Sequence, residues 1–328
     1  MFISLFGAVE SGIIYAIMAL GVYLTFRVLD FPDLTVEGSF VTGAAVAAFS
    51  IVNGIPPIVA TLLAAAAGFL AGCLTGILHT KGKINSLLAG ILMMTALYSI
   101  NLRIMGQPTL SLLNEITLFN QLQTIWNIIA LDSVFNGILT AVGMERLPKT
   151  WAIVIVMIIV TFGIKYLTDY YLKTEVGLAL RAIGDNKKMI RSLSANTDSL
   201  IIVGVGISNA LVALSGGLIA QLGGFADVNM GLGMIVIGLA SIIIGEALFG
   251  TKTVVRATLA VILGAVIYRI IVTLALRVDF LETGDMKLIT AVIVVAALVT
   301  PKIIQSRREQ KRRLIKRQQL KVGGDGHA

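Results

Sequence analysis

The sequence is poor in the side chains that most catalytic and metal sites require. Its 328 residues include one cysteine, Cys73, and two histidines, His79 and His327. One cysteine excludes an internal disulfide. So few thiols and imidazoles supply neither a zinc-binding cluster nor a nucleophile paired with a base. We therefore expect a chain that is not an enzyme, with no catalytic residue, no metal ligand and no cofactor of its own.

Charged residues are also scarce. Only 13% of the residues are charged and 57% are hydrophobic, and the mean hydropathy is +0.92. A soluble domain carries about 25% charged residues, so the composition excludes a soluble globular protein and a disordered chain. It also argues against an outer-membrane barrel, whose strands alternate polar and apolar residues. The expected fold class is all-α, a polytopic transmembrane helical bundle.

Long apolar runs set the expected number of membrane spans at about nine, because each span needs about 20 apolar residues. The runs cover residues 2–29, 40–52, 58–78, 84–102, 151–172, 200–222, 234–249, 253–276 and 286–304. The run at 40–52 is too short to span alone, and it follows a polar break at 30–39. We expect residues 1–305 to form a single transmembrane domain and residues 306–328 to form a basic cytoplasmic tail.

Positive charge predicts the orientation, since cytoplasmic loops carry an excess of lysine and arginine. Residues 302–321 hold nine basic residues and one acid, and residues 173–191 are basic as well. Both segments are expected inside, which puts the N-terminus outside and the C-terminus in the cytoplasm. The segment 106–150 is then expected to lie on or dip into the outer face, because a span there would move Lys81 and Lys83 outside. The tail suits anionic lipid and not nucleic acid, because it has no aromatic side chains for stacking.

The sequence contains a faint internal repeat. Residues 31–34, Phe-Pro-Asp-Leu, resemble residues 225–228, Phe-Ala-Asp-Val, and each is followed by glycine and a short apolar run. In the expected topology the two copies face opposite ways. Paired broken helices in inverted repeats are typical of transporters, although so short a match also arises by chance.

The most polar internal stretch is residues 173–197. Its apolar side chains, among them Leu178, Leu180 and Ile183, are unusual for a solvated loop. They predict two short amphipathic helices with a turn at residues 184–186, a form that suits a groove on a cytoplasmic partner. A plain positively charged loop is the alternative.

This stretch carries a motif, T-x-x-G-x-x-x-R-A-x-G-x-N. The matching residues are Thr174, Gly177, Arg181, Ala182, Gly184 and Asn186. The motif resembles the coupling loop of ABC importer permeases of the branched-chain amino acid and ribose type. Residues 33–39, Asp-Leu-Thr-Val-Glu-Gly-Ser, resemble the D-L-S-V-G-S break of that family, with Glu37 as one extra residue. The resemblance covers about residues 20–300. It departs at residues 194–197, Ser-Ala-Asn-Thr, where the family has G-I-N.

The resemblance implies a set of partners. They are cytoplasmic ABC ATPase subunits that bind ATP and magnesium, an extracellular substrate-binding lipoprotein or periplasmic protein, and a second copy of the permease. It also implies a bacterial plasma membrane and a coupling segment that seats in the ATPase. The residues expected to do this are Thr174, Glu175, Gly177, Leu178, Arg181, Ala182, Gly184, Asp185, Asn186 and Met189. Leu178, Leu180 and Met189 are expected to supply the apolar contacts to the ATPase.

The expected cargo is a small polar solute, with an amino acid first and a sugar or nucleoside next. The overall pattern is similar to the tryptophan and aromatic amino acid branch of the family. Polar residues inside a bilayer are costly and face a cavity or one another. Those expected to line a translocation path are Asp33, Thr35, Glu37, Ser39, Asn209, Gln221, Asp227, Asn229 and Glu246. The alternative for each is a structural pairing that holds the broken helices.

Two other classes of function remain open from the residues alone. An ion-gradient-driven secondary transporter shares broken helices and inverted repeats, but it has no need of the amphipathic segment at residues 173–197. A membrane-embedded transferase is disfavoured, because the His, Asp and Cys constellation that it needs is missing.

Overall fold

The computed structural model of the chain describes residues 2–129, 150–192 and 196–276, with the isolated positions 132, 136, 140, 148, 288, 291, 292 and 295. Most of the expected span at 286–304, the whole tail at 306–328 and most of residues 130–149 lie outside the described residues.

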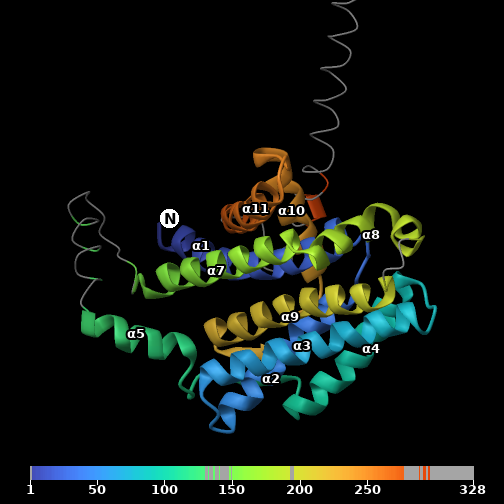
Figure 1. Cartoon of the computed structure of the whole chain (residues 1–328). Coiled ribbons are helices and arrows are strands. Elements are labelled where there is room, and N and C mark those ends of the chain that lie inside the picture. Colours follow the sequence, from blue (N-terminus) through green and yellow to red (C-terminus); the bar gives the residue numbers. More distant parts are fainter. Residues whose placement is uncertain are drawn as a thin grey trace, which may run out of the picture.

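The described chain is helical almost throughout (Figure 1). Its helices are α1 (Phe2–Tyr23), which continues as the π-helix η1 (Leu24–Val28), α2 (Thr35–Val52), α3 (Pro57–Thr80), α4 (Ser86–Met105), α5 (Leu118–Ile129), α7 (Ala152–Lys173), α8 (Glu175–Ser192), α9 (Thr197–Gly223), α10 (Met234–Phe249) and α11 (Val254–Ala275). Two short strands, β1 (Thr109–Ser111) and β2 (Phe225–Asp227), pair antiparallel.

Seven helices within the described residues are long and apolar enough to cross a membrane, and α10, with 16 residues, is shorter. The fold is therefore the polytopic helical membrane bundle that the composition predicts. The number of nine spans stays a prediction.

Helix α9 lies at the centre of the bundle, against α1, α2 and α3 (Figure 1). Small residues allow these helices to approach at backbone distance, as is usual between membrane helices. A side chain at Gly43 on α2 would overlap the Ala213 carbonyl of α9, and one at Gly68 on α3 would overlap the Asn209 carbonyl. On the remaining side, Ser208 of α9 donates a hydrogen bond to the Gly21 carbonyl of α1 over 2.6 Å.

The expected polar break at 30–39 is shorter than the sequence suggests. The chain is unwound only from Leu29 to Leu34, and α2 starts at Thr35, so the second half of the expected break is helical. The Asp33 carboxyl accounts for this difference, because its Oδ1 accepts a hydrogen bond from the Thr35 backbone amide over 2.9 Å and forms an Asx turn that leads into α2. With 18 residues, α2 is itself long enough to be a candidate span, which corrects the expectation that this segment is too short.

The two copies of the expected repeat share one local feature. Asp227 Oδ1 accepts a hydrogen bond from the Asn229 amide over 2.8 Å, as Asp33 does from Thr35. Their surroundings differ, since residues 225–227 form β2 whereas residues 31–34 are irregular. The inverted relation of the two copies stays a prediction.

The start of the segment 106–150 lies at the end of the bundle where α9 ends and α7 begins. The Leu118 amide donates to Gln221 Oε1 of α9 over 3.0 Å, and Phe119 packs with Ile153 at the start of α7. Helix α5 therefore lies at the opposite end of the bundle from α8 (Figure 1). The expected topology requires this arrangement, because it puts the segment 106–150 on the outer face and the coupling segment in the cytoplasm.

Candidate functional site

Helix α8 consists of two helical pieces joined at a kink. Asn186 leaves the helical conformation, with φ −152° and ψ 87°. Its side-chain Oδ1 accepts a hydrogen bond from the Met189 amide over 3.1 Å, which caps the second piece. The turn therefore falls within residues 184–186, where the sequence predicts it.

Backbone contacts fix α8 to the bundle. A side chain at Gly177 would collide with the Tyr171 carbonyl at the end of α7, and one at Gly184 would collide with the Val28 carbonyl at the end of η1. Leu180 and Ile183 are buried in the main core, and Leu180 is fully inaccessible. The expectation that Leu180 contacts an ATPase is therefore wrong, because this side chain is used to seat α8 on its own chain.

The other side of α8 is open to solvent. Its elbow face, as we define it, consists of the exposed residues Leu178, Arg181 and Asp185, which share one face of the first helical piece, and the exposed Met189 of the second piece. Leu178 and Met189 are 51% and 54% exposed, and α8 is not one of the helices apolar enough to cross a membrane, so lipid does not account for their exposure. The motif residues Glu175 and Asn186 are exposed too, whereas Thr174 and Ala182 are half-buried. The elbow face thus combines two charges with two apolar side chains on a helix whose backbone is packed against α7 and η1.

A polar cavity of about 340 Å³ lies beside α8. We call it the basic cavity. Its walls come from α1, η1, α8, α10, the α10–α11 loop and α11, and its lining residues are Tyr23, Arg27, Arg181, Glu246, Thr251, Lys252, Thr253, Val254 and Ala257. Arg27 and Glu246 form an ion pair across it. The predicted path residue Glu246 therefore lies at the α8 end of the bundle, among the basic groups that the charge pattern places on one side.

Four of the predicted path residues lie together in the bundle interior instead. Asp33 is fully buried, and its Oδ2 accepts a hydrogen bond from the Asn209 side-chain amide, Nδ2, over 2.7 Å. Thr35 shares a 2.8 Å hydrogen bond with Thr75 of α3, and Ser39 is fully buried one turn further along α2. These contacts join the unwound segment and α2 to α9 and α3. We call this set of four residues the Asp33 network.

The remaining path residues lie toward the α5 end. Gln221 donates to Thr61 over 2.8 Å and is buried, while Asp227 accepts from Thr109 of β1. Glu37 accepts from the Gly233 amide over 2.9 Å and lines an apolar cavity of about 150 Å³. Asn229 is exposed. The nine predicted residues thus fall into three places along the bundle, and their role in a path stays a prediction.

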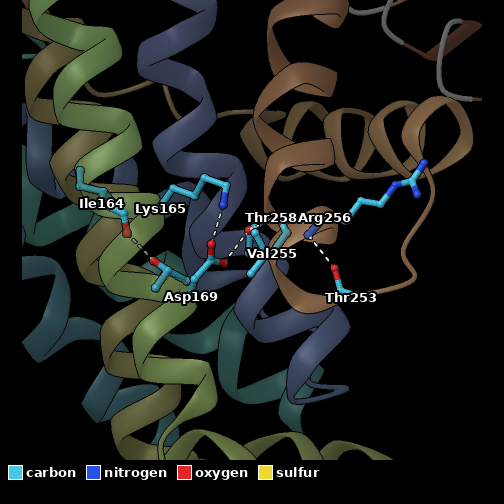
Figure 2. Close-up of polar contacts among 8 residues, drawn as sticks. Ile164, Lys165, Asp169, Thr253, Val255, Arg256 and Thr258 are labelled. Carbon is cyan, nitrogen blue, oxygen red and sulfur yellow. Dashed lines mark hydrogen bonds and ion pairs between the residues drawn. The ribbon is translucent and has the colours of Figure 1, made fainter.

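The sequence reasoning missed a buried charged cluster on α7. Lys165 and Asp169 form an ion pair one turn apart, and both side chains are more than 90% buried. Thr258 of α11 donates to the other oxygen of Asp169 over 2.6 Å, as Figure 2 shows. A lysine and an aspartate four residues apart in an apolar run were the available signal, because such a pair lies on one helix face. The pair joins α7 to α11.

Among the residues that the structure describes, no three His, Cys, Asp or Glu side chains gather as metal ligands would. The arrangement that does stand out is a multi-helix membrane bundle with a rigid amphipathic elbow at one end. These features define the class as a polytopic helical membrane protein.

Comparison with known proteins gives the family. Residues 4–298 match the family described as branched-chain amino acid transport system / permease component, and the chain belongs to it. It is 42% identical over 305 residues, 93% of this chain and 94% of the relative, to the tyrosine transport system permease protein of Clostridioides difficile (strain R20291). It is 34% identical over 207 residues, 63% of this chain and 64% of the relative, to the uncharacterized protein RP368 of Rickettsia prowazekii (strain Madrid E). No solved structure matches.

Proposed function

We propose that the chain is the membrane subunit of an ABC importer, which carries an amino acid into the cell while a separate cytoplasmic ATPase hydrolyses ATP. The elbow face is the observation that carries this proposal. It offers exposed apolar groups flanked by Arg181 and Asp185, which is the chemistry of a helix docked in a groove. An ion-driven carrier has no use for such a surface.

The seating of α8 supports a mechanical role. Gly177 and Gly184 place its backbone directly on α7 and η1, so a displacement of α8 is passed to two elements of the bundle. η1 leads into the unwound segment and the Asp33 network. ATP-driven closure of two ATPases would thus reach the centre of the bundle through packed groups that resist deformation. A homodimer of the permease presents two such elbows to two ATPases.

The proposed cargo is an aromatic amino acid, delivered at the α5 end by an extracellular binding protein. The named relative, which aligns over nearly its full length, is a tyrosine transport system permease protein. A sugar or nucleoside becomes the weaker alternative. We expect Glu37, Asp227 and Asn229 to meet the cargo on entry and Glu246 to meet it on exit, while the Asp33 network holds α2 in place.

The buried Lys165–Asp169 pair favours one competing function, a secondary transporter driven by protons, because a buried carboxylate in a span is typical of proton relays. The variant Asp169→Asn separates the two. If uptake by this variant still requires ATP and does not change with a pH gradient, the importer is supported. Uptake that follows the pH gradient in the wild type and is lost in the variant supports the carrier.

The test of the importer is co-purification in mild detergent from the native membrane. The tagged wild-type chain should recover an ABC ATPase in near-equal amount, and Arg181→Glu should lower the recovery at least tenfold. Arg103→Glu is the matched control, because Arg103 is exposed at the far end of α4. Equal recovery by both variants, or an active chain that is purified without an ATPase, contradicts the proposal.

A further inference from the structure

The basic cavity holds more positive charge than its own walls neutralise. Arg27, Arg181 and Lys252 line it together with one acid, Glu246. Glu246 is paired with Arg27. Within the part of the chain that the structure describes, neither Arg181 nor Lys252 forms an ion pair. Two cations therefore face a concave polar space, where low-dielectric walls strengthen their attraction for an anion.

The size and the mixed charge of the cavity narrow the class of ligand. About 340 Å³ lies in the usual range for small-molecule pockets, and it is larger than a lone phosphate needs. A phosphate would also meet the carboxylate of Glu246, which repels a second anion. A zwitterionic ligand matches both kinds of charge in the lining. Its carboxylate contacts Arg181 and Lys252, and its ammonium group contacts Glu246. Tyr23, Val254 and Ala257 supply apolar surface for its side chain.

We propose that the basic cavity binds a free α-amino acid from the cytoplasmic side and that this binding slows the transporter. The inference rests on the proposed function, because it takes the ligand to be the amino acid that the chain imports. The site therefore acts as a product sensor at the inner end of the protein.

The position of the cavity explains why occupancy would inhibit. Arg181 belongs to α8, Glu246 to α10, and Lys252 to the loop that leads into α11. An amino acid that contacts all three residues would link α8 to α10 and to the loop that leads into α11. Since a ligand favours the arrangement that it binds best, it holds α8 where it lies and opposes the displacement that coupling requires.

The experiment uses the complete transporter in proteoliposomes, with ATP sealed inside, the ATPase facing the lumen and labelled tyrosine delivered outside by its binding protein. Uptake is first measured with no amino acid in the lumen, which tests the proposed function by itself. Unlabelled tyrosine, tyramine or inorganic phosphate is then sealed inside at increasing concentration. Lumenal tyrosine should slow uptake at least fivefold. Tyramine, which lacks the carboxylate, and phosphate should not slow it.

The variant Lys252→Gln removes one cation of the cavity without touching the elbow face. We expect it to keep its uptake with an empty lumen and to need about ten times more lumenal tyrosine for half inhibition, because a charge-assisted contact is lost. Lys83→Gln is the matched control, since Lys83 is exposed in the turn between α3 and α4 and does not line the cavity. Its inhibition should equal that of the wild type.

The outcomes separate the two proposals. No ATP-dependent uptake with an empty lumen overturns the importer itself. Normal uptake that lumenal tyrosine does not slow overturns only the sensor, as does equal inhibition in Lys252→Gln and the wild type. Inhibition by phosphate in place of tyrosine also overturns it, because the site would then be selective for a simple anion.

Discussion

The elbow of α8 and the Asp33 network both contain polar residues in a largely apolar chain. The polar side chains are exposed in the elbow and buried in the Asp33 network. On α8 the charged side chains of Glu175, Arg181 and Asp185 are exposed, and Gly177, Leu180 and Gly184 make the internal contacts. In the Asp33 network the polar side chains are buried, and the Asp33 carboxylate accepts hydrogen bonds from Thr35 and Asn209. The polar residues of these two regions therefore differ in what they contact: solvent on α8, and other parts of the same chain around Asp33.

The difference follows from the backbone N–H and C=O groups that lack a helical hydrogen-bond partner in each region. An unwound segment inside the bundle exposes amide groups that must find partners in the absence of water, and Asp33 supplies one. The backbone of α8 is helical on both sides of Asn186, so its side chains are free to face outward. Substitutions of the same type at matched positions test this contrast.

The largest effect is expected at Asp33. Asp33→Ala removes the acceptor of the Thr35 backbone amide and one of the two acceptors of the Asn209 side-chain amide, and each buried N–H left without a partner costs about 1–3 kcal/mol. We expect a loss of about 4 kcal/mol of stability, seen as a large drop in the thermal unfolding midpoint in detergent. Asp185→Ala on the elbow face is the comparison and should leave the midpoint unchanged while it lowers transport. Equal midpoints for both variants would show that the Asp33 network does not hold the fold.

A smaller effect is expected within α8 itself. Leu180 is fully buried and Leu178 is 51% exposed, although only two positions separate them. Leu180→Ala should lower stability by about 3 kcal/mol, as large-to-small changes in a core do. Leu178→Ala should keep the unfolding midpoint and weaken recovery of the ATPase. The reverse pattern in the same two assays would mean that the two faces of α8 are assigned the wrong way round.

The smallest effect on stability is expected at Gly184. Gly184→Ala pushes α8 away from the Val28 carbonyl, and such overpacking costs about 1–3 kcal/mol. We expect ATP hydrolysis to continue while uptake per ATP falls, because the contact between α8 and η1 is disturbed. Gly163→Ala is the control, since a methyl group there meets no neighbouring atom. Unchanged uptake per ATP in Gly184→Ala would show that this contact does not transmit force.

Much of the fold could be predicted from the sequence. Apolar runs located the long helices within a few residues, and the motif around Gly177 and Gly184 located the kinked elbow. Local patterns were sufficient there. The length of a span is set by the thickness of the bilayer, and glycine is needed where a neighbouring backbone comes close. The start of α2 was missed, because it depends on how the Asp33 side chain turns back onto the Thr35 amide.

The sites were harder to predict than the helices. Leu180 and Leu178 look alike in the sequence, and only the packing of α8 on η1 and α7 separates them. The pairing of Arg27 with Glu246 joins residues more than 200 positions apart, so no local pattern contains it. The Lys165–Asp169 pair was visible in the spacing, but its bond to Thr258 depends on how α7 meets α11.

The most direct test of the elbow face is photo-crosslinking in the native membrane. A photoreactive amino acid in place of Leu178 should form a crosslink to an ABC ATPase subunit. The same group in place of Leu62, which is 63% exposed on α3, should not react with that subunit. A crosslink from Leu62 and not from Leu178, or from neither position in membranes that transport amino acid, would contradict the account.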